Sequence, residues 1–429
     1  MSSLYQKDGD SKRQQLLPEP DLESLAHGAI AAEELDTSVR LEQQILVQAT
    51  DEASRKKTIK DLQKDLQTAL DLELSTIPPY LSALYSIKEG TNREAVEIIR
   101  SVVVEEMLHM IMVSNLLNAV GGQPKVGQWT PDYPSHLPGN VMPQLVVPLD
   151  PLSKNTIRTF EKIEHPEGGL QFIKQEEEKQ KIRKQHKNKL PKKYSGIGEF
   201  YAAIQKTMNR LEKEAQAKGE TIFTANVNQV SNDQYYGAGG AIITVANLSD
   251  ANQLIEEIVG QGEGTLGTIF AEDYDPANDK LIIFGPDVEE YAHYFRFKEI
   301  RHERFYAIND SAHRDSRNRG LPTGPRFKVE WDQVYNFRPN PKLAHYKKSS
   351  PVYQKTLEFN QTYQALLDNI HKACNGAPDE LIKGITLMYD LKYKAVELMK
   401  TPLSKKDLVK GQEFEEGQTA GPSFELTDC

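Results

Sequence analysis

Two short acid–histidine steps in apolar surroundings constrain the fold of this chain more than any other feature. Glu106 and His109 lie three positions apart within the apolar run 102–112, and Glu290 and His293 repeat the spacing. Side chains three positions apart leave one face of an α-helix, so each step can present a carboxylate and an imidazole together. The pattern predicts two helices whose polar pairs face a common site inside an apolar core.

The surroundings of each step are more informative than its spacing. The chain has 62 acidic residues and 10 His in 429 positions, so about one or two such steps are expected by chance. A third step, Glu299 with His302, is flanked by Arg301 and Glu303. The first two steps have apolar or aromatic neighbours and are therefore favoured as ligands. Glu299 is expected to support them or to pair with Arg296.

Lone glutamates on other helices can complete a ligand set. Glu73 lies among leucines on a predicted helix, and the position one turn later is an isoleucine rather than a basic residue. A buried carboxylate is costly unless it is paired or bound to a metal, which favours Glu73 as a ligand. For the second lone carboxylate the sequence leaves two alternatives: Glu199, on a helix predicted over 198–217, and Glu263, at the end of a helix predicted over 250–262.

Two acid–histidine helices, with one glutamate from each of two further helices, form the ligand pattern of a di-iron carboxylate site in a four-helix bundle. Carboxylates and imidazoles suit two iron ions, with manganese as the alternative. Tyr80 and Tyr294, together with Glu299, are expected to support the ligands. The predicted metal ligands are Glu73, Glu106, His109, Glu290 and His293, with Glu263 or Glu199.

Helical periodicity organises most of the chain. A first helix is predicted over 54–87, kinked at Pro78 and Pro79, and a second follows and ends before a Gly-Gly pair at 121–122. Residues 123–195 are predicted to form a long proline-rich connection that ends in the charge run 174–193. Residues 221–248 are predicted as short extended pieces, and further helices over 287–306, 353–374 and 379–400.

The predicted fold class is mainly α: a four-helix bundle with long irregular connections and extra C-terminal helices. An N-terminal arm over 1–53 is expected to be partly disordered. A metal-binding bundle over 54–310 is followed by a connector and helical hairpin over 311–400, packed on the bundle, and by a tail over 401–429.

Composition limits the classes of function. Hydrophobic residues make up 38% of the chain, which suits a globular core, and the net charge of −10 argues against broad nucleic-acid binding. The two cysteines imply no disulfide framework and favour a reducing, cytoplasmic location. The N-terminus lacks the apolar region of a signal peptide, and no apolar run is long enough for a membrane span.

At these residues the chain resembles the ferritin-like domain family that includes iminophenyl-pyruvate dimer synthase. The resemblance covers roughly residues 60–426, and its segments are specific as a set rather than singly. That synthase carries this type of domain within a much longer chain, so its substrate is not transferred here. The matching segments are LELSTIPPYL at 72–81, EEMLH at 105–109, GEFY at 198–201, QGEG at 261–264, HYFRFKEI at 293–300, FNQTY at 359–363 and AGPSF at 420–424.

The resemblance implies a ferritin-like bundle with the metal ligands given above, and it slightly favours Glu263 over Glu199. We expect a non-haem di-iron enzyme that uses O2 to desaturate, hydroxylate or couple a small organic substrate, which can be derived from an amino acid. The alternatives are a ferroxidase without an organic substrate and a non-catalytic helical binding module. Expected partners are the substrate and O2, with an external electron donor and a homo-oligomer left open.

Overall fold

The computed structural model describes residues 57–166, 194–224, 228–235, 239–264, 269–271, 291–307, 309–312 and 317–427. The predicted arm over 1–53 and the charge run 174–193 lie outside these residues. The described part of the chain contains eight α-helices, two short 3-10 helices and isolated β-bridges, without a strand. The predicted mainly α fold is confirmed.

Helices α2 (Ile59–Ser86) and α3 (Arg93–Ala119) form a long antiparallel pair joined by a short turn. A capping box starts α2: the Thr58 hydroxyl accepts from the backbone N–H of Asp61, and the Asp61 carboxylate accepts from the backbone N–H of Thr58. The helix continues through Pro78 and Pro79. Pro79 cannot donate to the carbonyl of Ser75, and the Tyr133 hydroxyl donates to that carbonyl instead, at 2.8 Å.

A short helix, α4 (Lys154–Ile163), lies inside the segment 123–195 that was predicted as an irregular connection. The prediction was wrong here because α4 has only 10 residues and several of them are polar. Two other features stabilise this helix. The Ser153 side chain caps its start by accepting from the backbone N–H of Thr156, and Ile157 and Phe160 form a buried face.

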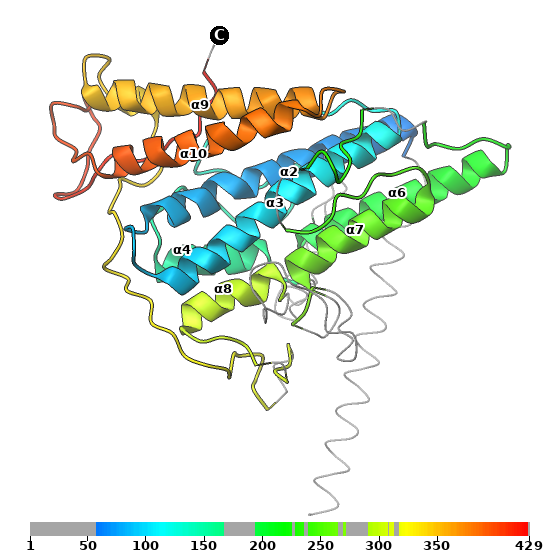
Figure 1. The fold of residues 1–429 in the computed structure, drawn as a ribbon, viewed down its shortest axis with the longest axis horizontal. Helices are drawn as coiled ribbons and strands as arrows, with labels where there is room; N and C mark the ends of the chain where they lie inside the picture. The colour runs from blue at the N-terminus through cyan, green and yellow to red at the C-terminus, as the bar shows by residue number, and fades with distance from the viewer. Residues whose placement is uncertain are drawn as a thin grey trace, which may run out of the picture. The chain divides into compact units, whose positions relative to one another are not determined.

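Helix α8 (His293–His302) packs against α4 and α3, and α2 contacts both α3 and α4. These four helices form a bundle (Figure 1). The predicted helix 287–306 is longer than the observed one. Its first residues, 287–290, lie outside the described residues. Its end is earlier than predicted, because Glu303 adopts a left-handed conformation with φ of 53° that ends α8.

Two further helix pairs pack on the bundle (Figure 1). Helix α6 (Ile197–Gln216) contacts α7 (Leu248–Glu263), with α6 on α2 and α7 on α3 and α8. Helix α9 (Pro351–Ala373) pairs with α10 (Glu380–Met399), and α10 contacts α2. The described residues of 221–247, predicted as extended pieces, are irregular. None of the described helices has both the length and the apolar composition that a bilayer crossing requires.

Candidate metal centre

The four bundle helices bring buried carboxylates and imidazoles into two overlapping clusters. One contains Glu73, Glu106 and His109, and the other contains Glu106, Glu164 and His293. Within each cluster one ligand atom from every residue lies within 4.8 Å of the others. All five side chains are at most 4% exposed. Glu106 belongs to both clusters, so its carboxylate can bridge two ions.

Each predicted ligand in the described residues has a definite position. Glu73 lies in the middle of α2, Glu106 and His109 lie one turn apart on α3, and His293 is the first residue of α8. The structure brings these four side chains together. Glu290 lies outside the described residues.

Glu164 was not predicted as a ligand, yet its carboxylate lies 3.5 Å from Nδ1 of His293. It is the residue directly after α4, so it could be found only by identifying that helix. The helical spacing of Ile157, Phe160 and Glu164, with a proline at position 166, was the signal in the sequence that marked it.

Glu199, one of the two alternatives for the last carboxylate, does not occupy the position that Glu164 takes. The Glu199 carboxylate accepts hydrogen bonds from the backbone N–H and the hydroxyl of Ser195, at 2.7 and 2.9 Å, and so closes the first turn of α6. It belongs to neither described cluster. Glu263 is the last residue of α7, and its side chain lies outside the description.

Two buried tyrosines donate hydrogen bonds to the cluster carboxylates. The Tyr80 hydroxyl donates to Glu164. The Tyr201 hydroxyl, from α6, donates to Glu73 at 2.5 Å. Burial and the adjacent carboxylates raise the pKa of both phenols well above its usual value. Both tyrosines therefore remain protonated donors that fix the orientation of a carboxylate.

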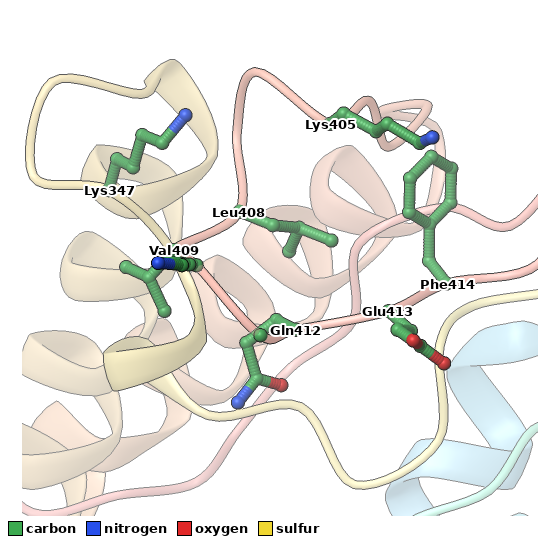
Figure 2. Close-up of a pocket in the computed structure, with 9 residues that line it drawn as sticks. Lys347, Lys405, Leu408, Val409, Gln412, Glu413 and Phe414 are labelled. Carbon is green, nitrogen blue, oxygen red and sulfur yellow. The ribbon is translucent and has the colours of Figure 1, made fainter.

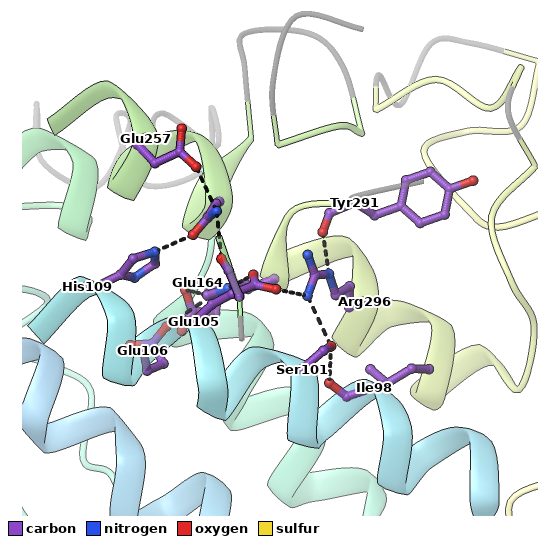
Figure 3. Close-up of polar contacts among 12 residues, drawn as sticks. Ile98, Ser101, Glu105, Glu106, His109, Glu164, Glu257, Tyr291 and Arg296 are labelled. Carbon is purple, nitrogen blue, oxygen red and sulfur yellow. Dashed lines mark hydrogen bonds and ion pairs between the residues drawn. The ribbon is translucent and has the colours of Figure 1, made fainter. Parts of the chain in front are cut away.

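In each imidazole, the ring nitrogen that faces away from the centre, Nε2, also has a hydrogen-bond partner. Nε2 of His109 lies 2.8 Å from Oε1 of Gln261, and Nε2 of His293 lies 2.8 Å from Oε2 of Glu105 (Figure 3). The other carboxylate oxygen of Glu105 accepts from Arg296 at 2.7 Å. Such partners fix the ring orientation of metal-binding histidines. Sequence reasoning missed Gln261, because a neutral amide is not part of any ligand motif.

The remaining predicted residues lie away from the clusters. The Tyr294 ring contacts His165, with ring centroids 5.0 Å apart. The Glu299 carboxylate accepts from the backbone N–H of Tyr306 at 2.7 Å, and burial raises its pKa to about 8. Glu299 therefore stabilises the segment after α8 rather than an imidazole. His302, from the third acid–histidine step, belongs to neither cluster.

The electrostatics of the clusters fit divalent cations. Four buried carboxylates are present, those of Glu73, Glu105, Glu106 and Glu164, and the Arg296 guanidinium forms an ion pair with the Glu105 carboxylate. Burial and the neighbouring Glu164 and Glu73 raise the pKa of Glu106 to about 7. Burial alone would lower the pKa of His109 and His293, but the carboxylates outweigh it and raise both. Bound cations would replace the protons that this charge excess retains.

One orphaned atom supports the same conclusion. Nδ1 of His293 is buried and makes no hydrogen bond, although it lies 2.9 Å from a Glu106 oxygen. Buried polar atoms are normally paired, so an unpaired ring nitrogen that faces two carboxylates needs an explanation. A metal ion between the three side chains would use that lone pair. The residues present therefore fit a two-metal centre of carboxylate and imidazole ligands.

An open surface hollow of about 550 Å³ lies elsewhere on the molecule (Figure 2). Its lining comes from the C-terminal segment 405–414 together with Lys347. None of these lining residues belongs to the two clusters or holds their imidazoles. The hollow is therefore not a wall of the metal centre.

Comparisons with known proteins agree with the fold. The model of the family described as Ferritin-like matches residues 66–302, which is more than half of the chain. The clustered glutamate and histidine side chains are of the kind that bind two metal ions in a helical bundle. The chain belongs to the ferritin-like family.

A curated relative and a solved structure extend this result. The chain is 25% identical over 422 residues to dichlorochromopyrrolate synthase from Lentzea aerocolonigenes, an alignment that covers 86% of this chain and 36% of the relative. The chain thus spans about a third of the length of that relative. A crystal structure of a ferritin-like protein from Caulobacter vibrioides matches with a TM-score of 0.51 and 23% identity, covering 80% of this chain and 96% of the other. This match shows the fold.

Proposed function

We propose that this protein is a non-haem di-iron oxidoreductase that uses O2 to oxidise a small organic substrate. The observation that carries the proposal is the sharing of Glu106 between two buried carboxylate–imidazole clusters. Two ferrous ions bound there would supply electrons to oxygen and oxidising power to the substrate. Manganese is the alternative metal, since the same donor atoms accept it.

The residues of this chain contribute geometry and exclusion of water. Glu106 would hold both ions at a fixed separation, with Glu73 and His109 on one side and Glu164 and His293 on the other. Tyr80, Phe160 and Phe297 pack ring against ring beside Glu164, with centroids 4.6–5.2 Å apart. This aromatic wall keeps water from one side of the centre, so charge interactions there are strong.

The choice of an organic substrate rests on the similarity to a synthase. The relative is named for the synthesis of dichlorochromopyrrolate, and the aligned region includes the cluster residues of the described bundle. We infer that this chain also serves biosynthesis, with an aromatic, amino-acid-derived molecule as the substrate class. A ferroxidase would use the same ligands, so the experiment has to separate oxidation of iron from oxidation of an organic molecule.

The experiment is an oxygen-consumption assay on the full chain loaded anaerobically with two equivalents of ferrous iron. Aromatic amino acids and their 2-oxo derivatives are added, and products are identified by mass spectrometry. We expect repeated turnover that depends on the organic compound and is lost in Glu106→Gln. The matched control is Glu199→Gln, which changes a buried glutamate outside the clusters and keeps the activity.

Other results would contradict the proposal. Oxygen uptake that stops after the ferrous iron is consumed, with every organic compound unchanged, is the result for a ferroxidase. A chain that binds no iron, or a single zinc ion, is not a di-iron enzyme.

A further inference from the structure

The two imidazoles face the centre through the same ring atom. Nδ1 of His109 lies 3.6 Å from Glu73, and Nδ1 of His293 lies 2.9 Å from Glu106 and 3.5 Å from Glu164. Both Nε2 atoms point outward. The rings are roughly parallel, with centroids 5.7 Å apart. The two halves of the centre are therefore similar in their inward donors, and they differ in what holds each ring from outside.

A neutral amide holds the His109 ring. The amide nitrogen of Gln261 donates to the Glu257 carboxylate at 2.8 Å and to the Gly239 carbonyl at 3.3 Å. Both of these partners are acceptors, so the nitrogen end of the amide must face them and its oxygen must face His109. Nε2 of His109 is then the protonated nitrogen, and Nδ1 keeps a lone pair for a metal.

A carboxylate that is ion-paired with a guanidinium holds the His293 ring. Oε2 of Glu105 lies 2.8 Å from Nε2 of His293, and Oε1 accepts from the Arg296 guanidinium at 2.7 Å (Figure 3). The Glu105 side chain is 1% exposed, so this ion pair is buried. A carboxylate without a proton can only accept, so Nε2 of His293 donates to it and Nδ1 again carries the lone pair.

These two acceptors differ in strength. A hydrogen bond to a charged acceptor is roughly twice as strong as one between neutral groups. A strong acceptor on the outer N–H of an imidazole pulls the proton away from the ring and makes the inner nitrogen a better electron donor. Arg296 withdraws some charge from Glu105, but a buried, ion-paired carboxylate remains a stronger acceptor than an amide oxygen. His293 is therefore the stronger donor of the two.

We propose that the centre is built with unequal halves. On the two-metal site of the proposed function, the His293 half binds a divalent ion more tightly than the His109 half, because Glu105 rather than an amide holds its imidazole. The tighter half fills first as metal is added. Glu105 and Gln261 act here as positioning residues, since each acts through an imidazole.

The test is an anaerobic titration of the metal-free full chain with Co2+, followed by absorbance and calorimetry. Wild-type protein is expected to show two classes of site that differ by tenfold or more, the lower end of what such outer partners typically contribute. Glu164→Gln should remove the tighter class, and Glu73→Gln should remove the weaker class. These two variants assign each class to a half of the centre.

Substituting the residues that accept from the two Nε2 atoms, Glu105 and Gln261, tests why the two affinities differ. Glu105→Gln should bring the two affinities to within about threefold of one another. Because that change also leaves Arg296 without its carboxylate, Gln261→Glu provides an independent variant, which should strengthen the weaker class and leave the tighter class unchanged.

Three results would overturn the proposal. The first is two equal classes in the wild-type chain. The second is loss of the tighter class in Glu73→Gln. The third is an unchanged weaker class in Gln261→Glu. In all three cases the wild-type chain still binds two ions, so the proposed di-iron function survives. A chain that binds no ion contradicts both.

Discussion

Glu106 is the residue on which the centre depends most. It lies on α3 between Glu73 and His109 on one side and Glu164 and His293 on the other. The Thr76 hydroxyl lies 2.7 Å from one of its oxygens, and Nδ1 of His293 lies 2.9 Å from the other. No other described side chain is common to the two clusters.

The raised pKa of Glu106 predicts how the stability of the metal-free protein depends on pH. The pKa is about 7 in the folded protein, against an ordinary value of 4.5. Between these values the folded protein keeps a proton that the unfolded chain releases, so the free energy of unfolding falls as pH rises. Glu106→Gln removes this titration. The free energy of unfolding should fall less between pH 5 and 7 in the variant than in wild type, by up to about 3 kcal/mol.

The measurement is urea unfolding of metal-free wild type and Glu106→Gln at several pH values. Parallel curves for the two proteins would show that Glu106 is ionised in the folded state and would contradict its position in the buried cluster.

Four of the five cluster residues could be predicted from sequence: His293 from its spacing to Glu290, and three more from their apolar helices. Glu73, Glu106 and His109 were recognisable because a polar side chain among leucines, valines and methionines demands a partner. Glu164 follows a short helix that the sequence analysis missed. Gln261 lies near the expected Glu263, but an amide that holds a histidine has no motif, and only the packing of α7 against α3 brings it to His109.

At the scale of helices, length decided what could be predicted. Helices α2, α3, α9 and α10 have at least 20 residues each, so their apolar periodicity is clear. Helices α4 and α8 have 10 residues each. The sequence left Glu199 and Glu263 open as the last carboxylate, because their helices, α6 with 20 residues and α7 with 16, are longer than α4 and easier to recognise. Tertiary packing of α4 against α8 determines which helix completes the bundle.

Helix α2 also shows how two prolines are accommodated beside the site. The Tyr133 hydroxyl donates to the Ser75 carbonyl, which Pro79 leaves without its helical donor. Tyr133→Phe should lower the free energy of unfolding by about 1–3 kcal/mol, because a buried carbonyl loses its partner. Tyr389→Phe is the control, since the Tyr389 side chain is 63% exposed. Equal denaturation midpoints for the two variants would mean that the carbonyl is satisfied in another way.

For the whole molecule, metal binding should couple the four bundle helices. Ligands come from α2, α3, the end of α4 and the start of α8, so ions would bind the folded chain in preference to the unfolded one. A free metal concentration of about 1,000 times the dissociation constant adds about 4 kcal/mol per site to the free energy of unfolding.

Thermal melts with and without Mn2+ measure this coupling. We expect a rise in Tm for wild type that is larger at pH 8 than at pH 6, because Glu106 and both imidazoles must lose protons to bind a metal. Glu106→Gln should show little rise. A rise of the same size in wild type and Glu106→Gln would mean that the ions bind elsewhere.

The iron stoichiometry of three proteins tests the central claim most directly. Metal-free wild type, Glu164→Gln and Glu199→Gln are titrated anaerobically with ferrous iron, and bound iron is measured after gel filtration. Two irons per chain are predicted for wild type and for Glu199→Gln, and one for Glu164→Gln, because Glu164 is a ligand of one half while Glu199 only closes the first turn of α6. Two irons in Glu164→Gln together with one in Glu199→Gln would contradict the assignment of the centre to the bundle of α2, α3, α4 and α8.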